Sequence, residues 1–155
     1  MDTPLQATLQ APGFRVGIRC DDMEIHSLTY LEPGPEIPPQ NALAAETLRQ
    51  LQAYLDDPES PFCLPLRPSG TGFQRRVWSR IATIPCHQVL TYGEVAAQLH
   101  SAPRAVGQAC GSNPFPLIVP CHRVIAANGQ LGGFARQSGG FLIEVKRWLL
   151  AHEGH

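Results

Sequence analysis

A cysteine followed directly by a histidine, Cys121 and His122, is the pair in this sequence best suited to covalent chemistry. A thiolate is a strong nucleophile, and a neighbouring imidazole can take the thiol proton directly or through one water molecule. The dipeptide alone is weak evidence for a nucleophile, because a small buried cysteine beside a surface histidine gives the same sequence pattern. The remaining cysteines lack this context and are expected to be structural: Cys20, Cys63, Cys86 and Cys110.

Cysteine usage and hydropathy indicate where such a protein works. Five cysteines at irregular spacing are a poor disulfide framework. The first residues show no charged-then-apolar signal pattern, and no apolar run approaches the roughly 18 residues of a membrane helix. Hydrophobic residues make up 43% and charged residues 16% of the 155 positions, as in globular proteins. We therefore expect a cytoplasmic protein with reduced thiols and no membrane partner.

The net charge of -1 hides an asymmetry between two halves. Residues 1–69 carry ten acidic and four basic side chains, whereas residues 70–155 carry three acidic and eight basic ones. A basic half is suited to a polyanion, and an acidic half is expected to face away from it. A proline-rich stretch over residues 58–68, followed by two glycines, lies close to this change, so we place a domain boundary between residues 69 and 70.

The first half has the pattern of a few strands followed by one helix. Residues 1–32 mix short apolar stretches with polar breaks, which is typical of strands. The prolines of residues 33–39 make a stiff connection that cannot join a sheet. Asn41 is a credible N-cap for a helix through about Leu55, with three leucines on one face: Leu48, Leu51 and Leu55.

The second half has the pattern of a helix-turn-helix. Thr91 and Glu94 form a T-x-x-E capping box that opens a short helix over residues 92–99. A tight turn follows at residues 100–102, and Pro103 suits the first turn of a second helix that ends near Gly111. Two short helices around a three-residue turn are typical of this motif.

Further helices are expected on either side of that motif. Apolar residues at four-residue spacing predict a helix over residues 73–83. An apolar extended run over residues 117–119 leads into Cys121, and a glycine-rich loop follows. One face of the C-terminal helix should then carry Phe141, Val145, Trp148, Leu149 and His152.

Residues 70–155 resemble the O6-alkylguanine-DNA alkyltransferase family over nearly their whole length. The matching stretches are Gly70-Thr71-Gly72-Phe73-Gln74, Val77-Trp78, Ile84-Pro85, Thr91-Tyr92-Gly93-Glu94-Val95-Ala96, Arg104-Ala105-Val106-Gly107, Asn113-Pro114, Pro120-Cys121-His122-Arg123-Val124-Ile125 and Trp148-Leu149-Leu150-Ala151-His152-Glu153-Gly154. The P-C-H-R-V-[IV] element is highly specific. Residues 1–69 resemble the family's variable lobe only in size and in strand-then-helix order.

The resemblance implies an α+β fold of two small lobes and assigns roles to four residues. The N-terminal lobe would be a sheet with a helix, and the mostly helical C-terminal lobe would carry the DNA-binding and alkyl-acceptor functions. Cys121 would be the acceptor, and His122 would act as base through a water. Glu153 would orient and polarise His122, and Asn113 would be the hinge that ties the recognition helix to the active-site segment. Such a relay lowers the cost of forming a thiolate in an apolar pocket.

The target atom lies within the base stack, so the resemblance also implies that the damaged nucleotide is rotated outward. Tyr92 would crowd the phosphate and help to turn the base out, and Arg104 would fill the vacated space. The second helix would enter the minor groove, and small residues such as Ala105 and Gly107 would keep it slim. From the sequence alone, close helix packing explains small residues equally well. The Val124 carbonyl would face the polar edge of the guanine.

Three departures from the family pattern concern the turn and the pocket. His87 stands where the family usually has glycine. Phe134 occupies a position that is commonly tyrosine, which removes a hydroxyl from the base's surroundings. About three additional residues follow it, so the pocket wall that includes Ser138 is expected to differ in shape.

The implied activity is DNA repair by single-turnover transfer of a methyl or other alkyl group from O6-alkylguanine, and from O4-alkylthymine, in duplex DNA to Cys121. The partner is double-stranded DNA that contains alkylated guanine, bound by a monomer, with cooperativity along the DNA left open. We expect no cofactor and no metal. Cys20, His26 and Cys63 would supply three zinc ligands, but a fourth with sensible spacing is missing.

The sequence allows three other functions besides alkyl transfer to Cys121. A catalytically silent relative that only binds alkylated guanine is the nearest, but such proteins carry tryptophan where this chain has Cys121. A transcription factor would use the helix-turn-helix and leave the Cys121 motif unexplained. A cysteine hydrolase is disfavoured because no obvious oxyanion-hole loop accompanies the thiol.

Overall fold

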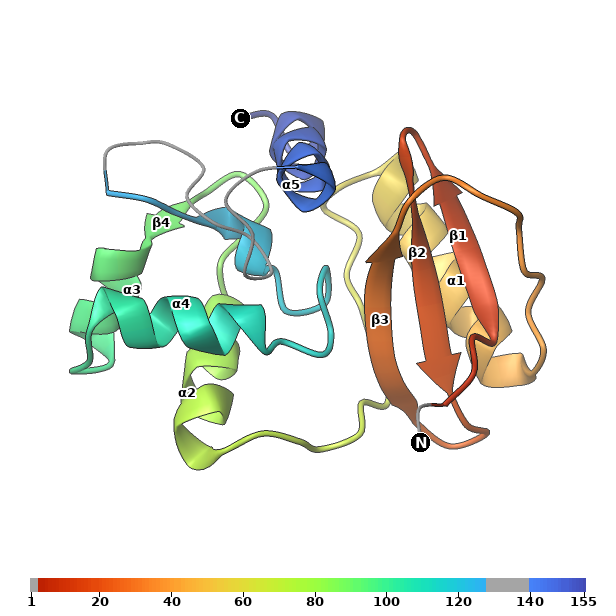
Figure 1. The fold of residues 1–155 in the computed structure, drawn as a ribbon, viewed down its shortest axis with the longest axis horizontal. Coiled ribbons are helices and arrows are strands. Elements are labelled where there is room, and N and C mark those ends of the chain that lie inside the picture. The colour runs from red at the N-terminus through yellow and green to blue at the C-terminus, as the bar shows by residue number, and fades with distance from the viewer. Residues whose placement is uncertain (1–2, 128–139) are drawn as a thin grey trace. The chain divides into compact units, whose positions relative to one another are not determined.

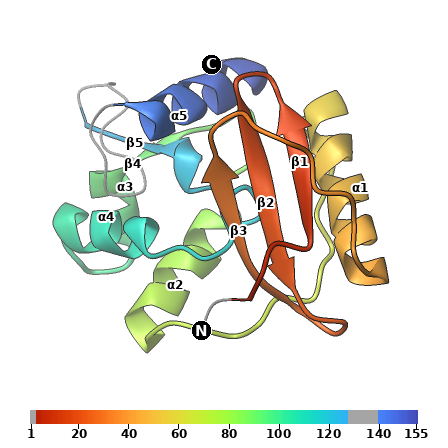
Figure 2. The same cartoon turned by 45° about the vertical axis from the view of Figure 1, so that its right-hand side comes forward.

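The structure, a computed structural model, describes residues 3–127 and 140–155. Contacts divide the chain into two compact units, Met1–Pro68 and Ser69–His155, which Figures 1 and 2 show from two directions. A strand-rich first part followed by a mostly helical second part confirms the predicted α+β class. Within the described ranges, no helix is long and apolar enough to cross a membrane.

The first unit is an antiparallel sheet with one helix on a face. Its strands β1 (Ala7–Ala11), β2 (Phe14–Cys20) and β3 (Ile25–Leu31) follow one another in sheet order. Alternate residues of β2 are buried, as expected for a strand with one face on a core. Helix α1 (Ala42–Asp56) packs against β1 and β2, behind the red strands in Figure 1.

Helix α1 begins where the sequence predicts, but it buries a different face. The Asn41 side chain accepts a hydrogen bond from the Ala44 backbone nitrogen at 2.7 Å, which confirms the N-cap. Of the three leucines expected on the core face, Leu51 is fully buried and the other two are only half-buried. The buried stripe instead includes Ala44, Thr47, Leu51 and Tyr54. Thr47 tolerates burial because its hydroxyl donates to the Leu43 carbonyl at 2.8 Å.

The second unit contains the predicted helix-turn-helix. Helix α3 spans Tyr92–Gln98 and helix α4 spans Pro103–Gly111, side by side in both views. The Thr91 hydroxyl accepts from the Glu94 nitrogen at 3.0 Å, and the Glu94 carboxylate accepts from the Thr91 nitrogen at 3.0 Å. The capping box is therefore confirmed. Helix α2 (Gly72–Ile81) starts with a second such box, between Thr71 and Gln74, and helix α5 (Phe141–His152) ends the unit.

Two short strands join the helix-turn-helix to the segment around Cys121. Strand β4 (Leu90–Thr91) directly precedes α3, and it pairs in parallel with β5 (Val124–Ile125). A single 3₁₀ turn over Cys121–Arg123 comes immediately before β5. The start of α3 and the residues after Cys121 are thus held by the same ladder.

The extended run predicted at residues 117–119 is wrong. Pro116 and Val119 pair with each other across a turn, and Leu117 has a φ of 76°. Asn113 holds this turn, because its side-chain oxygen accepts from the Phe115 nitrogen at 2.9 Å and its Nδ2 donates to the Val119 carbonyl at 2.9 Å.

Candidate active site

Cys121 begins the 3₁₀ turn and is only 3% exposed. The Asn113 Nδ2 donates to its sulfur at 3.4 Å. The neighbouring Cys110 and burial raise the pKa of the Cys121 thiol, and Asn113 and the positive charge of Lys146 only partly oppose them. The resting sulfur is therefore a protonated thiol, and it needs a base before it can act as a nucleophile.

His122 follows Cys121 into the interior, where it is 1% exposed. Its Nε2 lies 2.7 Å from Oε2 of Glu153. An ionised carboxylate can only accept, so Nε2 carries the ring proton and Nδ1 keeps the lone pair. Burial lowers the pKa of His122, although Glu153 opposes this, so the ring is neutral near pH 7. Nδ1 is buried and has no hydrogen-bond partner among the residues that the structure describes.

Arg123 fixes the carboxylate that orients His122. Its Nε donates to Glu153 Oε1 at 2.8 Å and its Nη2 donates to Glu153 Oε2 at 2.9 Å. Its Nη1 donates to the Ile84 carbonyl at 2.6 Å. A two-point contact with a guanidinium keeps the buried carboxylate ionised and fixes its plane. Arg123 belongs to the sequence motif around Cys121, but the motif did not predict this role for it.

Lys146 is a buried residue that sequence reasoning missed. It is 0% exposed on α5, and its Nζ donates to the Val124 carbonyl at 2.8 Å and lies 5.7 Å from the centre of the Tyr92 ring. Burial lowers its pKa to about 8, and negative charge on either of the nearby Cys110 and Cys121 would oppose this. The buried face of α5 was predicted only in part, since Val145 and Leu149 are buried whereas Phe141 and Trp148 are half-buried.

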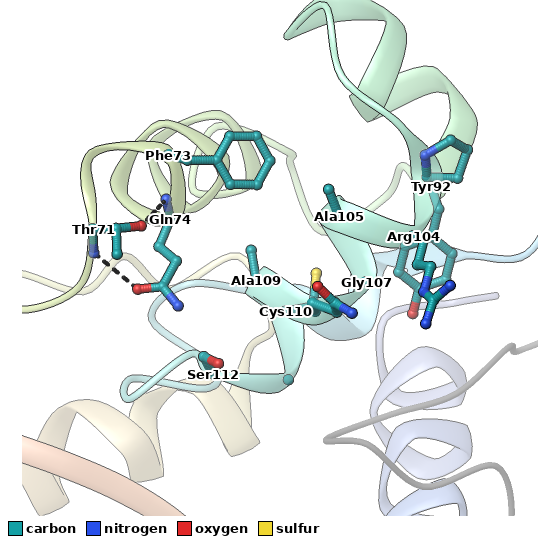
Figure 3. Close-up of a pocket in the computed structure, with 13 residues that line it drawn as sticks. Thr71, Phe73, Gln74, Tyr92, Arg104, Ala105, Gly107, Ala109, Cys110 and Ser112 are labelled. Carbon is teal, nitrogen blue, oxygen red and sulfur yellow. Dashed lines mark hydrogen bonds between the residues drawn. The ribbon is translucent and has the colours of Figure 1, made fainter.

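Helix α4 lines an open groove of about 960 Å³, with contributions from α2 and α3 (Figure 3). The groove brings together all four residues that the sequence predicts for DNA binding: Tyr92, Arg104, Ala105 and Gly107. Arg104 is exposed at the start of α4, and burial raises the pKa of Tyr92. Cys110, which the sequence predicts to be structural, also lines this groove.

Gly107 distinguishes between the two explanations for the small residues of α4. A Cβ atom built at this position meets no heavy atom within 4 Å, and the backbone is not in the left-handed region. Glycine in the middle of a helix costs about 0.5–1 kcal/mol relative to alanine. Among the residues that the structure describes, neither packing nor backbone geometry explains this cost in stability.

Several of the other predicted positions lie away from the groove or outside the described residues. Phe134 and Ser138 fall outside the described residues. The Val124 side chain is fully buried, and its carbonyl accepts from Lys146. Among the potential zinc ligands, Cys20 contacts Asn41 and His26 contacts Asp21. The described residues show no metal-ligand cluster made of Cys20, His26 and Cys63.

Comparisons with known proteins identify the family of this chain. Residues 72–155 match the model of the 6-O-methylguanine DNA methyltransferase DNA-binding domain. A methylated-DNA--protein-cysteine methyltransferase of Shigella flexneri is 53% identical over 94 residues, which are 59% of this chain and 52% of that protein. One from Methanosarcina mazei is 46% identical over 110 residues, which are 70% of this chain and 66% of that protein. The match thus spans about half the length of the Shigella relative.

Solved structures extend the likeness to the first unit. The O6-methylguanine methyltransferase of Mycobacterium tuberculosis has a TM-score of 0.80 at 35% identity, over 97% of this chain and 93% of that one. The same organism's OGT, solved in complex with DNA, has a TM-score of 0.79 at 36% identity, over 94% and 90% of the two chains. This chain belongs to the O6-methylguanine DNA methyltransferase family, which confirms the resemblance seen in the sequence.

Proposed function

We propose that this protein repairs DNA by moving an alkyl group from the O6 atom of guanine in duplex DNA to Cys121, once per molecule. One observation carries the proposal. Arg123 contacts Glu153, Glu153 contacts His122, and these buried side chains lie next to Cys121. A buried thiol with a raised pKa needs a base, and a neutral histidine with a lone pair on Nδ1 can serve as one. O4-alkylthymine is the second substrate we propose.

In the transfer step, His122 takes the proton of Cys121 through a water, and Glu153 stabilises the resulting imidazolium. The Cys121 sulfur forms a bond to the alkyl carbon as the bond from that carbon to guanine O6 breaks. The guanine leaves with the electron pair of that bond and takes up a proton. The Asn113 Nδ2 contact at 3.4 Å stabilises the developing thiolate charge.

The groove along α4 is the proposed DNA-binding surface. The open space at Gly107 and the exposed Arg104 at the helix start support this role, and DNA binding itself is supported by the M. tuberculosis relative solved in complex with DNA. Tyr92 would help to turn the damaged nucleotide out, and Arg104 would occupy the space that it leaves. We propose that the protein binds as a monomer without metal or cofactor.

The test is mass spectrometry after mixing the protein with an excess of duplex that contains O6-methylguanine. We expect one added methyl group per chain, on the peptide that contains Cys121, and no further turnover. A thioether is a poor leaving group and lies off the reversible oxidation pathway of cysteine, so reductants should not restore the thiol. More than one equivalent of methyl released per chain, or a label on another cysteine, would contradict the mechanism.

A further inference from the structure

A second cysteine lies beside the acceptor. Cys110, near the end of α4, is half-buried and lines the groove, where Figure 3 shows its sulfur in yellow. Its carbonyl accepts from the Asn113 nitrogen at 3.2 Å, and the Asn113 side chain donates to the Cys121 sulfur at 3.4 Å. The Cys110 side chain is itself within hydrogen-bonding reach of Cys121. One asparagine therefore connects the backbone of one cysteine to the sulfur of the other.

The surroundings of the two sulfurs support the same placement. Negative charge on either Cys110 or Cys121 would raise the pKa of both Lys146 and Tyr92, so the two sulfurs lie in one small region of the second unit. They differ in access, because Cys121 is buried and Cys110 reaches the open groove. Among the described residues, Cys110 is therefore the more exposed of the two thiols and the first expected to react with an agent in the groove.

We propose that Cys110 and Cys121 form a reversible redox pair, in which a hydroperoxide oxidises Cys110 first and Cys121 then closes a disulfide with it. The Cys110 thiolate attacks one peroxide oxygen, the O–O bond breaks, and the other oxygen leaves as an alcohol or water after taking a proton. Cys110 is then a sulfenic acid. The Cys121 sulfur attacks the sulfenic sulfur, and the hydroxyl leaves as water with the thiol proton. Two thiols are oxidised to one disulfide, and the peroxide accepts the two electrons.

The disulfide would protect Cys121 from irreversible oxidation. A cysteine oxidised past the sulfenic acid becomes a sulfinic acid, which ordinary thiols do not reduce, whereas a disulfide is restored by thiol exchange. If Cys121 accepts an alkyl group only once, as the proposed function holds, irreversible oxidation would inactivate the protein before it binds alkylated DNA. Cys110 would keep the acceptor in a recoverable form.

Tryptic mapping tests the pair without any DNA. Cleavage after Arg104 and Arg123 gives one peptide, residues 105–123, whose only cysteines are Cys110 and Cys121. After brief treatment with hydrogen peroxide, we expect this peptide to lose two hydrogen atoms and to resist alkylation until it is reduced. A treated peptide 105–123 that carries sulfinic acid or free thiols, with no internal disulfide, would overturn the proposal.

Variants supply the second measurement. After peroxide and then dithiothreitol, wild type should recover its capacity to accept methyl from DNA, whereas Cys110→Ser and Cys110→Ala should recover several-fold less. Cys63→Ser, which removes an exposed thiol of the first unit, should recover like wild type. Equal recovery in the Cys110 variants would refute the pairing. Untreated wild type that accepts no methyl would instead refute the proposed function and leave the peptide result standing.

Discussion

Gly107 offers a prediction in which protein stability and DNA binding should move in opposite directions. It is the fifth of the nine residues of α4, and within the described residues nothing occupies the space that its Cβ would take. Gly107→Ala should therefore raise the free energy of unfolding by about 0.5–1 kcal/mol, because nothing offsets the gain in helix propensity. For a chain of this size, that corresponds to a rise in Tm of about 1–4 °C.

Gly107→Leu extends the same change into the groove. Leucine is a good helix former, so the variant should fold with at least wild-type stability. Its side chain would occupy the space that we assign to DNA, and we expect the Kd for a duplex to rise about tenfold or more, which is about 1.4 kcal/mol. Ala97→Leu is the matched control, since Ala97 is exposed on α3 and does not line the groove.

Thermal melting and fluorescence anisotropy with a labelled duplex, at one fixed salt concentration, measure the two quantities. Reaction with a free alkylated guanine base should remain close to wild type in Gly107→Leu, because the change lies on the DNA face and not in the thiol relay. Equal DNA affinity in Gly107→Leu and Ala97→Leu would refute the assignment of the groove. A lower Tm in Gly107→Ala would refute the structural reasoning beneath it.

Four other outcomes are expected. Arg104→Ala should slow repair of duplex DNA far more than reaction with a free alkylated base, and equal losses would show that the side chain does not act in flipping. Cys121→Ala should bind the duplex like wild type and accept no methyl, as a gel shift and mass spectrometry will show. Because burial lowers the pKa of His122, the wild-type single-turnover rate should fall only below about pH 6.5. His122→Gln should lose that fall and gain rate only at strongly alkaline pH, because the raised pKa of Cys121 keeps its thiol protonated at lower pH. The pKa of Lys146 is about 8 in the folded state against 10.5 when unfolded. Between pH 8 and 10.5 the unfolded state holds more protons, so denaturation should show wild type gaining on the order of 3 kcal/mol relative to Lys146→Met as pH rises.

Features that depend on a few adjacent residues could be predicted from the sequence. The Asn41 cap and the Thr91 capping box use side chains that bond to backbone three positions away, so their patterns suffice. The contact between His122 and Glu153 spans 31 positions, and only the family motif pointed to it. Their proposed roles in transfer stay predictions until they are measured.

Features that depend on distant partners could not be predicted. A lysine on a helix is ordinarily exposed, and Lys146 is buried because the Val124 carbonyl, 22 positions away, meets its Nζ. Residues 117–119 look extended by composition, but Asn113 draws the chain into a turn. Cys110 was predicted to be structural because the residues next to it in sequence include no base or second thiol. In the structure its side chain lies beside Cys121.

Asn113 shows how recognition and chemistry can be connected in the second unit. One amide holds the backbone after α4, the turn before Cys121 and the sulfur itself, through contacts to Phe115, Val119 and Cys121. On the opposite side of the motif, β4 links the start of α3 to β5, which directly follows the 3₁₀ turn. Both helices of the helix-turn-helix are therefore tied to the segment that carries the thiol. If DNA displaces α4, the Asn113 side chain offers one path by which the displacement reaches the sulfur, and this path needs both the donor and the acceptor atom of an asparagine.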